Sequence, residues 1–372
     1  MEFWTSHPSA PTRAADVAAV AEGLGWDGLT TVDSQDLSGD PYVFLALAAT
    51  GSTRLGLQTS VTNPVTRVAA ETATSAMSVQ KLSKGRMIVG IGRGDSALAH
   101  LGRSPAKLKW FGEYLVSLQA YLRGDEVNFE HTGTLDQQAA PVEILGLADA
   151  PSSSSIKWPA GIDKVPVEVA ATGEKVIGMA ARYSDRIMFA LGADTERLKW
   201  GINTAIEAAS KAGKGPVSLK FGAYINIVCH HNLDVVRDLG RAGTSLFARF
   251  SVMHGTVSGP VSEKQREIFR TIHDSYDMNM HAREGSQQSK VMTDEFMDGY
   301  AVIGGVEHCS ERLQEVEKLG ISKVSVTGPS FTAKSDEGLE AAAGFSEKVM
   351  PLCSNSHRSS NKDSDSNLEK SD

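Results

Sequence analysis

Residues 54–97 read RLGLQTSVTNPVTRVAAETATSAMSVQKLSKGRMIVGIGRGDSA, and this stretch decides the fold. Its two apolar runs, at 54–61 and 86–92, are typical of strands that are covered on both faces. Between them, Ala69, Ala73 and Ala76 recur at the spacing of one face of a helix. A strand, a helix and a second strand in this order indicate a parallel sheet.

The same alternation continues along most of the chain. Apolar runs, nearly all followed by a helical pattern, lie at 1–6, 28–33, 54–61, 86–92, 165–173, 185–192, 218–228 and 321–328. Eight such units predict an α/β fold of the closed (β/α)8 type, a TIM barrel, rather than an open sheet.

The repeat is interrupted twice and stops before the C-terminus. We predict one catalytic barrel domain over 1–353, with insertions at about 124–164 and 249–300, the second between strands seven and eight. Insertions of this length are usually lids or binding loops, or else disordered. The stretch FARFSVMHGTVSGP in the second insertion is too apolar for disorder. By contrast, 354–372 has one large apolar residue, Leu368, and is predicted to be a disordered tail.

Charge and composition restrict the partners. A net charge of -8 and a pI near 5.7 argue against a protein that binds nucleic acid or an anionic membrane, so we expect a small-molecule substrate. No run approaches the ~20 apolar residues that cross a bilayer, and MEFWTSHPSAP lacks the features of a signal peptide. Cys229, Cys309 and Cys353 form no CxxC pair and are expected to be reduced thiols in the core. Together these features predict a cytoplasmic protein.

The active site of a (β/α)8 barrel lies at the C-terminal ends of its strands. The residues at these positions are mostly polar, small or glycine, which suits a broad planar ligand that the backbone approaches closely. Asp33, Asp95 and His230 stand there as single residues, without an HxH pair or paired carboxylates. No metal site is therefore predicted.

The glycine-rich stretch GIGRGD (90–95) invites comparison with the dinucleotide-binding fingerprint. That fingerprint needs the spacing G-x-G-x-x-G, and here Asp95 stands where the third glycine should fall. The stretch also follows the fourth strand rather than the first strand of a βαβ pair. A dinucleotide-binding fold is therefore disfavoured.

The stretch VAATGEK (169–175) is the better candidate for binding phosphate, because a strand end leads directly into a helix. The backbone N–H groups of Thr172, Gly173 and Glu174 would point at an anion held at the positive end of that helix. An ordinary strand-to-helix turn has the same spacing, so both interpretations stay open.

Three stretches together resemble one known family. TSVTNPVTR (59–67), LSKGRMIVGIGRGDSA (82–97) and VAATGEK (169–175) resemble the luciferase-like flavin and deazaflavin oxidoreductases, the luciferase-like monooxygenase superfamily. The match is closest to the F420-dependent branch around methylenetetrahydromethanopterin reductase. The resemblance implies a TIM barrel with an insertion after strand seven, and coenzyme F420 or FMN bound at the C-terminal mouth. It also implies that the 249–300 insertion closes over the site.

The resemblance assigns the cofactor-binding residues. A non-prolyl cis peptide at Ser60–Val61 would form a bulge behind the tricyclic ring, and the loops after strands four and five would hold the phosphate. The residues implied are Ser60, Val61, Arg93, Gly94, Ala171, Thr172, Gly173 and Glu174.

The resemblance also implies which residues carry the chemistry. Asp33 and Asp95 match acidic positions near the ring and its substrate; Asp95 could instead cap the following helix. The branch often carries a Glu at the end of the first strand, whereas this chain reads WTSHP, so Ser6 or His7 would take that place. A histidine with a pKa of ~6.5 could donate or accept a proton there. We expect His7, Asp33 and Asp95 to settle the proton balance.

The function implied is hydride transfer between reduced F420 and a small organic substrate. One alternative is an FMN-dependent monooxygenase that uses molecular oxygen, and another is a non-catalytic flavin-binding protein on the same barrel. Dimerisation is common for such barrels, so a homodimer is compatible with this assignment.

Overall fold

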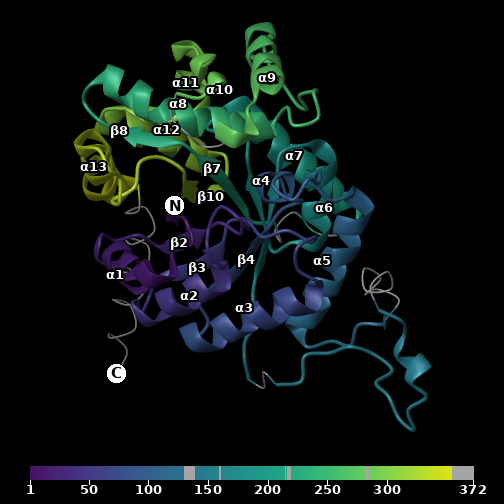
Figure 1. Cartoon of the computed structure of the whole chain (residues 1–372). Coiled ribbons are helices and arrows are strands. Elements are labelled where there is room, and N and C mark those ends of the chain that lie inside the picture. Colours follow the sequence, from purple (N-terminus) through teal and green to yellow (C-terminus); the bar gives the residue numbers. More distant parts are fainter. Residues whose placement is uncertain (130–138, 159–160, 214, 216–218, 281–284, 354–372) are drawn as a thin grey trace, which may run out of the picture.

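The computed structural model describes residues 1–129, 139–158, 161–213, 215, 219–280 and 285–353. Parallel strands close into a barrel in the order β1-β10-β7-β6-β5-β4-β3-β2 (Figure 1). Their bounds are β1 Glu2–His7, β2 Gly28–Thr31, β3 Gly56–Thr59, β4 Met87–Ile91, β5 Val167–Ala171, β6 Arg186–Phe189, β7 Phe221–Ile225 and β10 Ile321–Val326. The predicted TIM barrel is confirmed, and the predicted tail at 354–372 lies outside the described residues.

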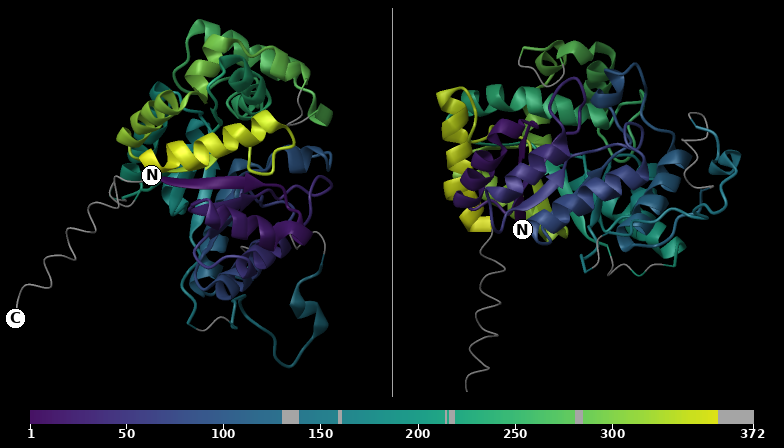
Figure 2. Two further views of the ribbon diagram at one scale, coloured as in Figure 1. Left: turned by 90° about the vertical axis from the view of Figure 1, so that its left-hand side faces the viewer. Right: turned by 60° about the horizontal axis from the view of Figure 1, so that its bottom comes forward.

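Helices cover the outside of the barrel (Figures 1 and 2). Outward-facing strand residues such as Leu29, Val89 and Val169 are fully buried beneath them. In Figure 2 the yellow C-terminal helical segment runs beside β1, where the rings of Phe3 and Phe345 are 5.4 Å apart. The covering helices are α1 Ala14–Gly23, α2 Pro41–Thr50, α3 Ala69–Ser83, α5 Leu108–Arg123, α6 Glu174–Tyr183, α7 Thr195–Lys211, α12 Val306–Lys318 and α13 Asp336–Ala343. Shorter pieces are η1 Pro11–Arg13, α4 Ser96–Ala99, η3 Val142–Leu145 and a π-helical turn, η6 Gly344–Val349.

A buried polar layer fills the lower part of the barrel lumen. The Lys323 ammonium donates hydrogen bonds to Gln58 at 2.7 Å and to Glu168 at 2.9 Å, and lies 3.4 Å from the centroid of the Trp4 ring. A Cβ on Gly28 would lie 2.2 Å from that ring, so only glycine leaves room for the indole. Because the N-terminal side of the lumen is filled, a ligand can enter only from the C-terminal mouth.

The predicted seventh strand is two strands in the structure. The run 218–228 was expected to be continuous, but the barrel strand β7 ends at Ile225, and β8 Ile227–Cys229 leaves the barrel to pair with β9 Val302–Gly304. The break falls at Asn226, whose side-chain amide donates to the Thr327 carbonyl oxygen at 2.7 Å beside the end of β10. The prediction missed β9, because this short strand lies at the end of the expected insertion.

The second insertion is helical and covers the C-terminal end of the barrel. Helix α8 Leu233–Phe250 leads into α9 Glu263–Ser275, η5 Met278–Met280, α10 Gln287–Lys290 and α11 Asp294–Tyr300, which lie together in Figure 1. Phe269, Phe296 and Met297 form the centre of a separate apolar cluster among these helices. The insertion therefore packs around a hydrophobic cluster separate from the barrel core, which it shares with Val228 of β8 and Ile303 of β9.

The first insertion joins the opposite end of the barrel. It follows the C-terminus of α5 and precedes β5, and in Figure 1 it extends away from the end that α8 to α11 cover. Val127 and Ser154 pair across it, with backbone N···O distances of 2.8 and 2.9 Å in the two directions. Its described residues therefore lie far from the mouth. Among the helices of the described residues, none is long and apolar enough to span a membrane.

Candidate active site at the barrel mouth

The Ser60–Val61 peptide bond directly after β3 is cis, as the resemblance implied. This turn brings Val61 over the end of β4: a Cβ on Gly92 would lie 3.1 Å from the Val61 Cγ2 atom and 3.8 Å from the Ala170 Cβ atom. Glycine at position 92 therefore lets the bulge come close to β4 and β5. The three residues form an apolar wall at the mouth.

Asp33 lies buried behind this bulge and is fully engaged in hydrogen bonds. Its carboxylate accepts from Thr62 Oγ1 at 2.6 Å, from Arg67 Nε at 3.2 Å and from Gln35 Nε2 at 2.9 Å. The Arg67 guanidinium also pairs with Asp40 and Glu71, and the surrounding carboxylates raise its pKa despite partial burial. Asp33 therefore ties the loop after β2 to the bulge after β3. Sequence reasoning missed Arg67, although it ends the TSVTNPVTR stretch.

Asp95 faces the second insertion. Its carboxylate pairs with the Arg249 guanidinium near the end of α8, and both side chains are mostly buried. The Arg249 guanidinium also lies 4.4 Å from the centroid of the Tyr276 ring. Asp95 occupies the N-cap position of α4, but its carboxylate accepts no hydrogen bond from the backbone of that helix. Asp95 instead ties the loop after β4 to the insertion, through two residues that sequence reasoning missed.

Arg93 and Gly94 shape the loop between β4 and α4. Arg93 Nε donates to the Ala106 carbonyl oxygen at 2.7 Å, and its Nη1 lies 3.4 Å from His254 Nε2. Gly94 has a φ of +87°, and a Cβ there would lie 2.5 Å from Leu98. The backbone of this loop therefore requires glycine at position 94, and the Arg93 guanidinium is held between the loop and the insertion.

The VAATGEK stretch is a strand end followed directly by a helix. Ala171 ends β5, Gly173 precedes α6 in an extended conformation, and no side chain caps the helix. A Cβ on Gly173 would lie 3.7 Å from the Ser258 Oγ atom, so the insertion approaches this helix start. Thr172 is partly buried and Glu174 is exposed. The phosphate-binding role of these residues stays a prediction.

His7 lies behind the barrel wall rather than in the lumen. The Trp4 ring fills the lumen, so the alternation of a strand turns Thr5 and His7 outward and Ser6 inward. The His7 ring packs 4.7 Å from the Phe331 ring, and its Nε2 lies 3.4 Å from Thr5 Oγ1. Burial lowers the pKa of His7 to about 4, with a smaller contribution from Arg13. The imidazole is therefore neutral at physiological pH.

Apolar side chains complete the mouth. Met188 on β6, Ala190 just after β6 and Tyr224 on β7 form a buried cluster. Four partly buried side chains pack against it: Val61, Ala170, Phe247 and Phe250. The Tyr224 and Phe247 rings stack with centroids 5.7 Å apart, and Phe250 meets Phe247 edge-on. Helix α8 therefore places the rings of Phe247 and Phe250 over the lumen. No local pattern in the sequence indicated that these rings would lie there.

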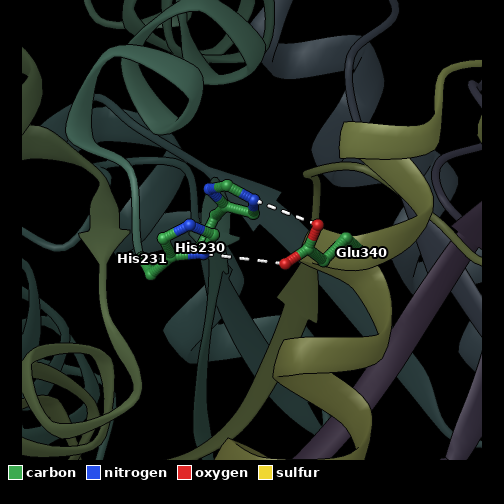
Figure 3. A group of neighbouring side chains, drawn as sticks. All are labelled: His230, His231 and Glu340. Carbon is green, nitrogen blue, oxygen red and sulfur yellow. Dashed lines mark ion pairs between the residues drawn. The ribbon is translucent and has the colours of Figure 1, made fainter.

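A histidine cluster lies outside the barrel, after β8 (Figure 3). His230 Nε2 lies 3.4 Å from one Glu340 carboxylate oxygen, and His231 Nδ1 lies 3.6 Å from the other. The ligand atoms of these three residues are close enough together to hold a metal ion. However, His230 Nδ1 already accepts a hydrogen bond from the Asn232 backbone N–H at 3.1 Å, which leaves Nε2 to face Glu340. The contact of His230 Nε2 with the Glu340 carboxylate accounts for the arrangement without a metal ion.

The closed barrel and the cis peptide at Ser60–Val61 agree with what the resemblance to the flavin and deazaflavin oxidoreductases implied. The family model described as luciferase-like monooxygenase matches residues 2–323, and the chain belongs to this family. The predicted family and enzyme class are confirmed.

Individual relatives agree with this assignment. The 5,10-methylenetetrahydromethanopterin reductase of Methanolobus tindarius is 25% identical over 327 residues, covering 87% of this chain and 92% of the relative. The structure of the coenzyme F420 dependent tetrahydromethanopterin reductase from Methanopyrus kandleri matches with a TM-score of 0.71 at 18% identity, covering 94% of this chain and 98% of that one. An F420-dependent secondary alcohol dehydrogenase in complex with an F420-acetone adduct matches with a TM-score of 0.66 at 16% identity, covering 95% and 99%. The two structural matches support the fold.

Proposed function

We propose that the protein binds coenzyme F420 at the barrel mouth and catalyses hydride transfer between the reduced deazaflavin and a small organic substrate. The observation that carries this proposal is the apolar wall of Val61, Gly92 and Ala170 at the barrel mouth. A flat ring needs such a wall on one face. The structural matches with TM-scores of 0.71 and 0.66 carry F420 in their names, whereas others with TM-scores of 0.60 and 0.61 carry FMN, and we therefore propose F420 first.

The residues present fit such a cofactor. The uncapped start of α6, directly after Ala171 at the end of β5, offers the backbone N–H groups of Thr172, Gly173 and Glu174 to an anion. Ser60 and Val61 would contact the ring, while Arg93 and Gly94 would bound the site on the β4 side. When bound, the cofactor supplies the hydride-transfer chemistry, and the protein supplies position and electrostatics.

The chain's own residues hold the site together and exclude water. Asp33 fixes the bulge through Thr62, and the pair of Asp95 and Arg249 holds the end of α8 against the loop after β4. The two aromatic rings of α8 then cover the lumen, which excludes water from the reacting centre. We assign proton handling to Asp95 and Asp33, and a supporting role behind β1 to His7.

The cover formed by the two aromatic rings of α8 also suits an FMN-dependent monooxygenase, because an oxygenated intermediate must be protected from water. Anaerobic titration of the purified protein with F420 and with FMN, followed by absorbance, separates these functions. We expect tight binding of F420, with reduced F420 stable to air on the protein. Preferential binding of FMN, with fast oxidation of the reduced form by oxygen, would support the monooxygenase. Binding without any turnover over a panel of ketones, aldehydes and imines would support a flavin-binding protein.

We also propose that the enzyme is cytoplasmic, acts as a homodimer and does not bind nucleic acid. The acidic net charge of -8 supports the last point. Light scattering coupled to size-exclusion chromatography would measure the mass in solution, and a monomer at micromolar concentration would contradict the dimer.

A further inference from the structure

The upper part of the lumen contains buried hydroxyl groups without hydrogen-bond partners. Ser325 on β10 lies two residues beyond Lys323, so both side chains face the lumen. Tyr224 on β7 pairs in register with Ser325 and faces the same way. Both residues are buried, and neither hydroxyl has a partner at hydrogen-bonding distance and angle among the described residues.

Tyr224 crosses the lumen beneath the bulge. Its strand β7 lies opposite β3, because β6, β5 and β4 separate them on one side of the barrel and β10, β1 and β2 on the other. Burial raises the pKa of the Tyr224 phenol. The hydroxyl of Ser60, just after β3, is close enough to the phenol to lower that pKa in part. The phenol therefore reaches the far wall of the mouth. Its hydroxyl lies beside Ser60 without completing a hydrogen bond to it.

The ring of Tyr224 is packed on its face, whereas its buried hydroxyl has no partner among the described residues. The face of its ring is covered by Phe247 of α8, and Met188 and Ala190 pack against it. Ser60, where the cis bulge begins, is the side chain that acts on the Tyr224 hydroxyl. Buried polar groups in native proteins are nearly always hydrogen-bonded, so an orphaned one at a binding site indicates a missing ligand or water.

We propose that Tyr224 is a ligand-contacting residue whose phenol donates a hydrogen bond to an acceptor atom on the flat ring of the cofactor, with Ser60 beside it. This inference rests on the proposed function and names a specific donor within it. The raised pKa of Tyr224 keeps the phenol protonated through the physiological range, so it acts as a donor rather than a base. Substitution by phenylalanine removes this donor and preserves the stacking on Phe247.

The main rival explanation is a structural hydroxyl that bonds an ordered water. Tyr121 on α5 provides a matched control, because it is also buried, also lacks a partner for its hydroxyl, and lies outside the barrel. If buried hydroxyls in this protein serve only stability, Tyr224→Phe and Tyr121→Phe should behave alike. If Tyr224 contacts the ligand, the two variants should differ in cofactor binding.

The experiment titrates wild-type protein, Tyr224→Phe and Tyr121→Phe with F420 and with FMN, and records the dissociation constant, the visible spectrum of the bound cofactor and the melting temperature of each apoprotein. For Tyr224→Phe we expect the Kd of the preferred cofactor to rise about 5- to 10-fold, as for one lost neutral hydrogen bond. We also expect a shifted visible band of the bound ring and a folded apoprotein. Tyr121→Phe should keep the wild-type Kd and spectrum.

Two results would overturn the inference and are distinguishable from each other. If wild-type protein binds a cofactor and Tyr224→Phe binds it with the same Kd and spectrum, the donor role is wrong and the proposed function stands. If wild-type protein binds neither F420 nor FMN, the proposed function fails and the inference fails with it. Should Tyr224→Phe be unfolded, Ser60→Ala tests the same contact, and unchanged binding in that variant would contradict the inference.

Discussion

The buried His7 should make the folded state sensitive to acid, and His7→Gln should remove that sensitivity. Burial lowers the pKa of His7 from 6.5 to about 4. Because the folded-state pKa is the lower one, the stabilisation is fully present above pH 6.5 and is lost as the pH falls toward 4. At 1.36 kcal/mol for each pH unit, protonation of His7 should lower the free energy of unfolding by about 3 kcal/mol between pH 7 and pH 4.

Urea unfolding at pH 7, 5.5 and 4 measures this effect. The variant is expected to be less stable than wild type at pH 7, because Gln packs less well against Phe331, but to lose about 2 to 3 kcal/mol less on acidification. His231→Gln is the matched control, since the His231 side chain is 80% exposed and should leave the wild-type pH profile unchanged. Parallel profiles for wild type and His7→Gln would refute the reasoning, because His7 would then titrate alike in the folded and unfolded states.

Three further predictions concern the mouth and the lumen. Arg249→Gln leaves the Asp95 carboxylate without its partner, so hydrogen exchange in the 249–276 segment should become faster; unchanged exchange would show that this ion pair does not hold the insertion. Gly92→Ala places a Cβ 3.1 Å from the Val61 side chain, so it should weaken cofactor binding several-fold and lower the free energy of unfolding by about 1 kcal/mol. An unchanged affinity for the cofactor would contradict the proposal that Val61, Gly92 and Ala170 contact its ring. Lys323→Met leaves the buried Glu168 carboxylate without its partner and should lower the free energy of unfolding, measured in urea, by about 3 to 5 kcal/mol. A loss under about 1 kcal/mol would show that the Lys323–Glu168 pair in the lumen does not stabilise the fold.

The sequence predicted the barrel because its evidence is local and repeated. Each strand is an apolar run, and each following helix shows its own period, so the order of elements could be derived without knowing any contact. The cis bond at Ser60–Val61 was also predicted, through the resemblance of TSVTNPVTR to a family motif rather than through any property of the two residues.

The break in the seventh strand could not be seen in the same way. The run SLKFGAYINIV is mostly apolar, and its single Asn does not by itself show that the barrel strand ends there. The reason for the break lies elsewhere in the chain: β9 offers a second pairing partner, and the Thr327 carbonyl oxygen accepts from the Asn226 amide. Competition between distant strands leaves no signature in a short window of sequence.

The acidic residues of the site could be predicted from the sequence, whereas their ion-pair partners and the orientation of His7 could not. Asp33 and Asp95 were predicted as acids at strand ends, but their partners Arg67 and Arg249 were not. Ion pairs that join residues 34 and 154 positions apart have no short spacing to detect. The side of the wall on which His7 lies depends on the register of a single short strand. That register is fixed by the Trp4 ring in the lumen, a tertiary contact that the sequence did not reveal.

The most direct test of the central claim is a crystal structure of the protein with the preferred cofactor bound. The account predicts a flat ring in contact with Val61 at the barrel mouth, with its phosphate on the backbone N–H groups at the start of α6 after Gly173. A cofactor bound elsewhere on the molecule, or a ring in the mouth with its phosphate away from α6, would contradict it.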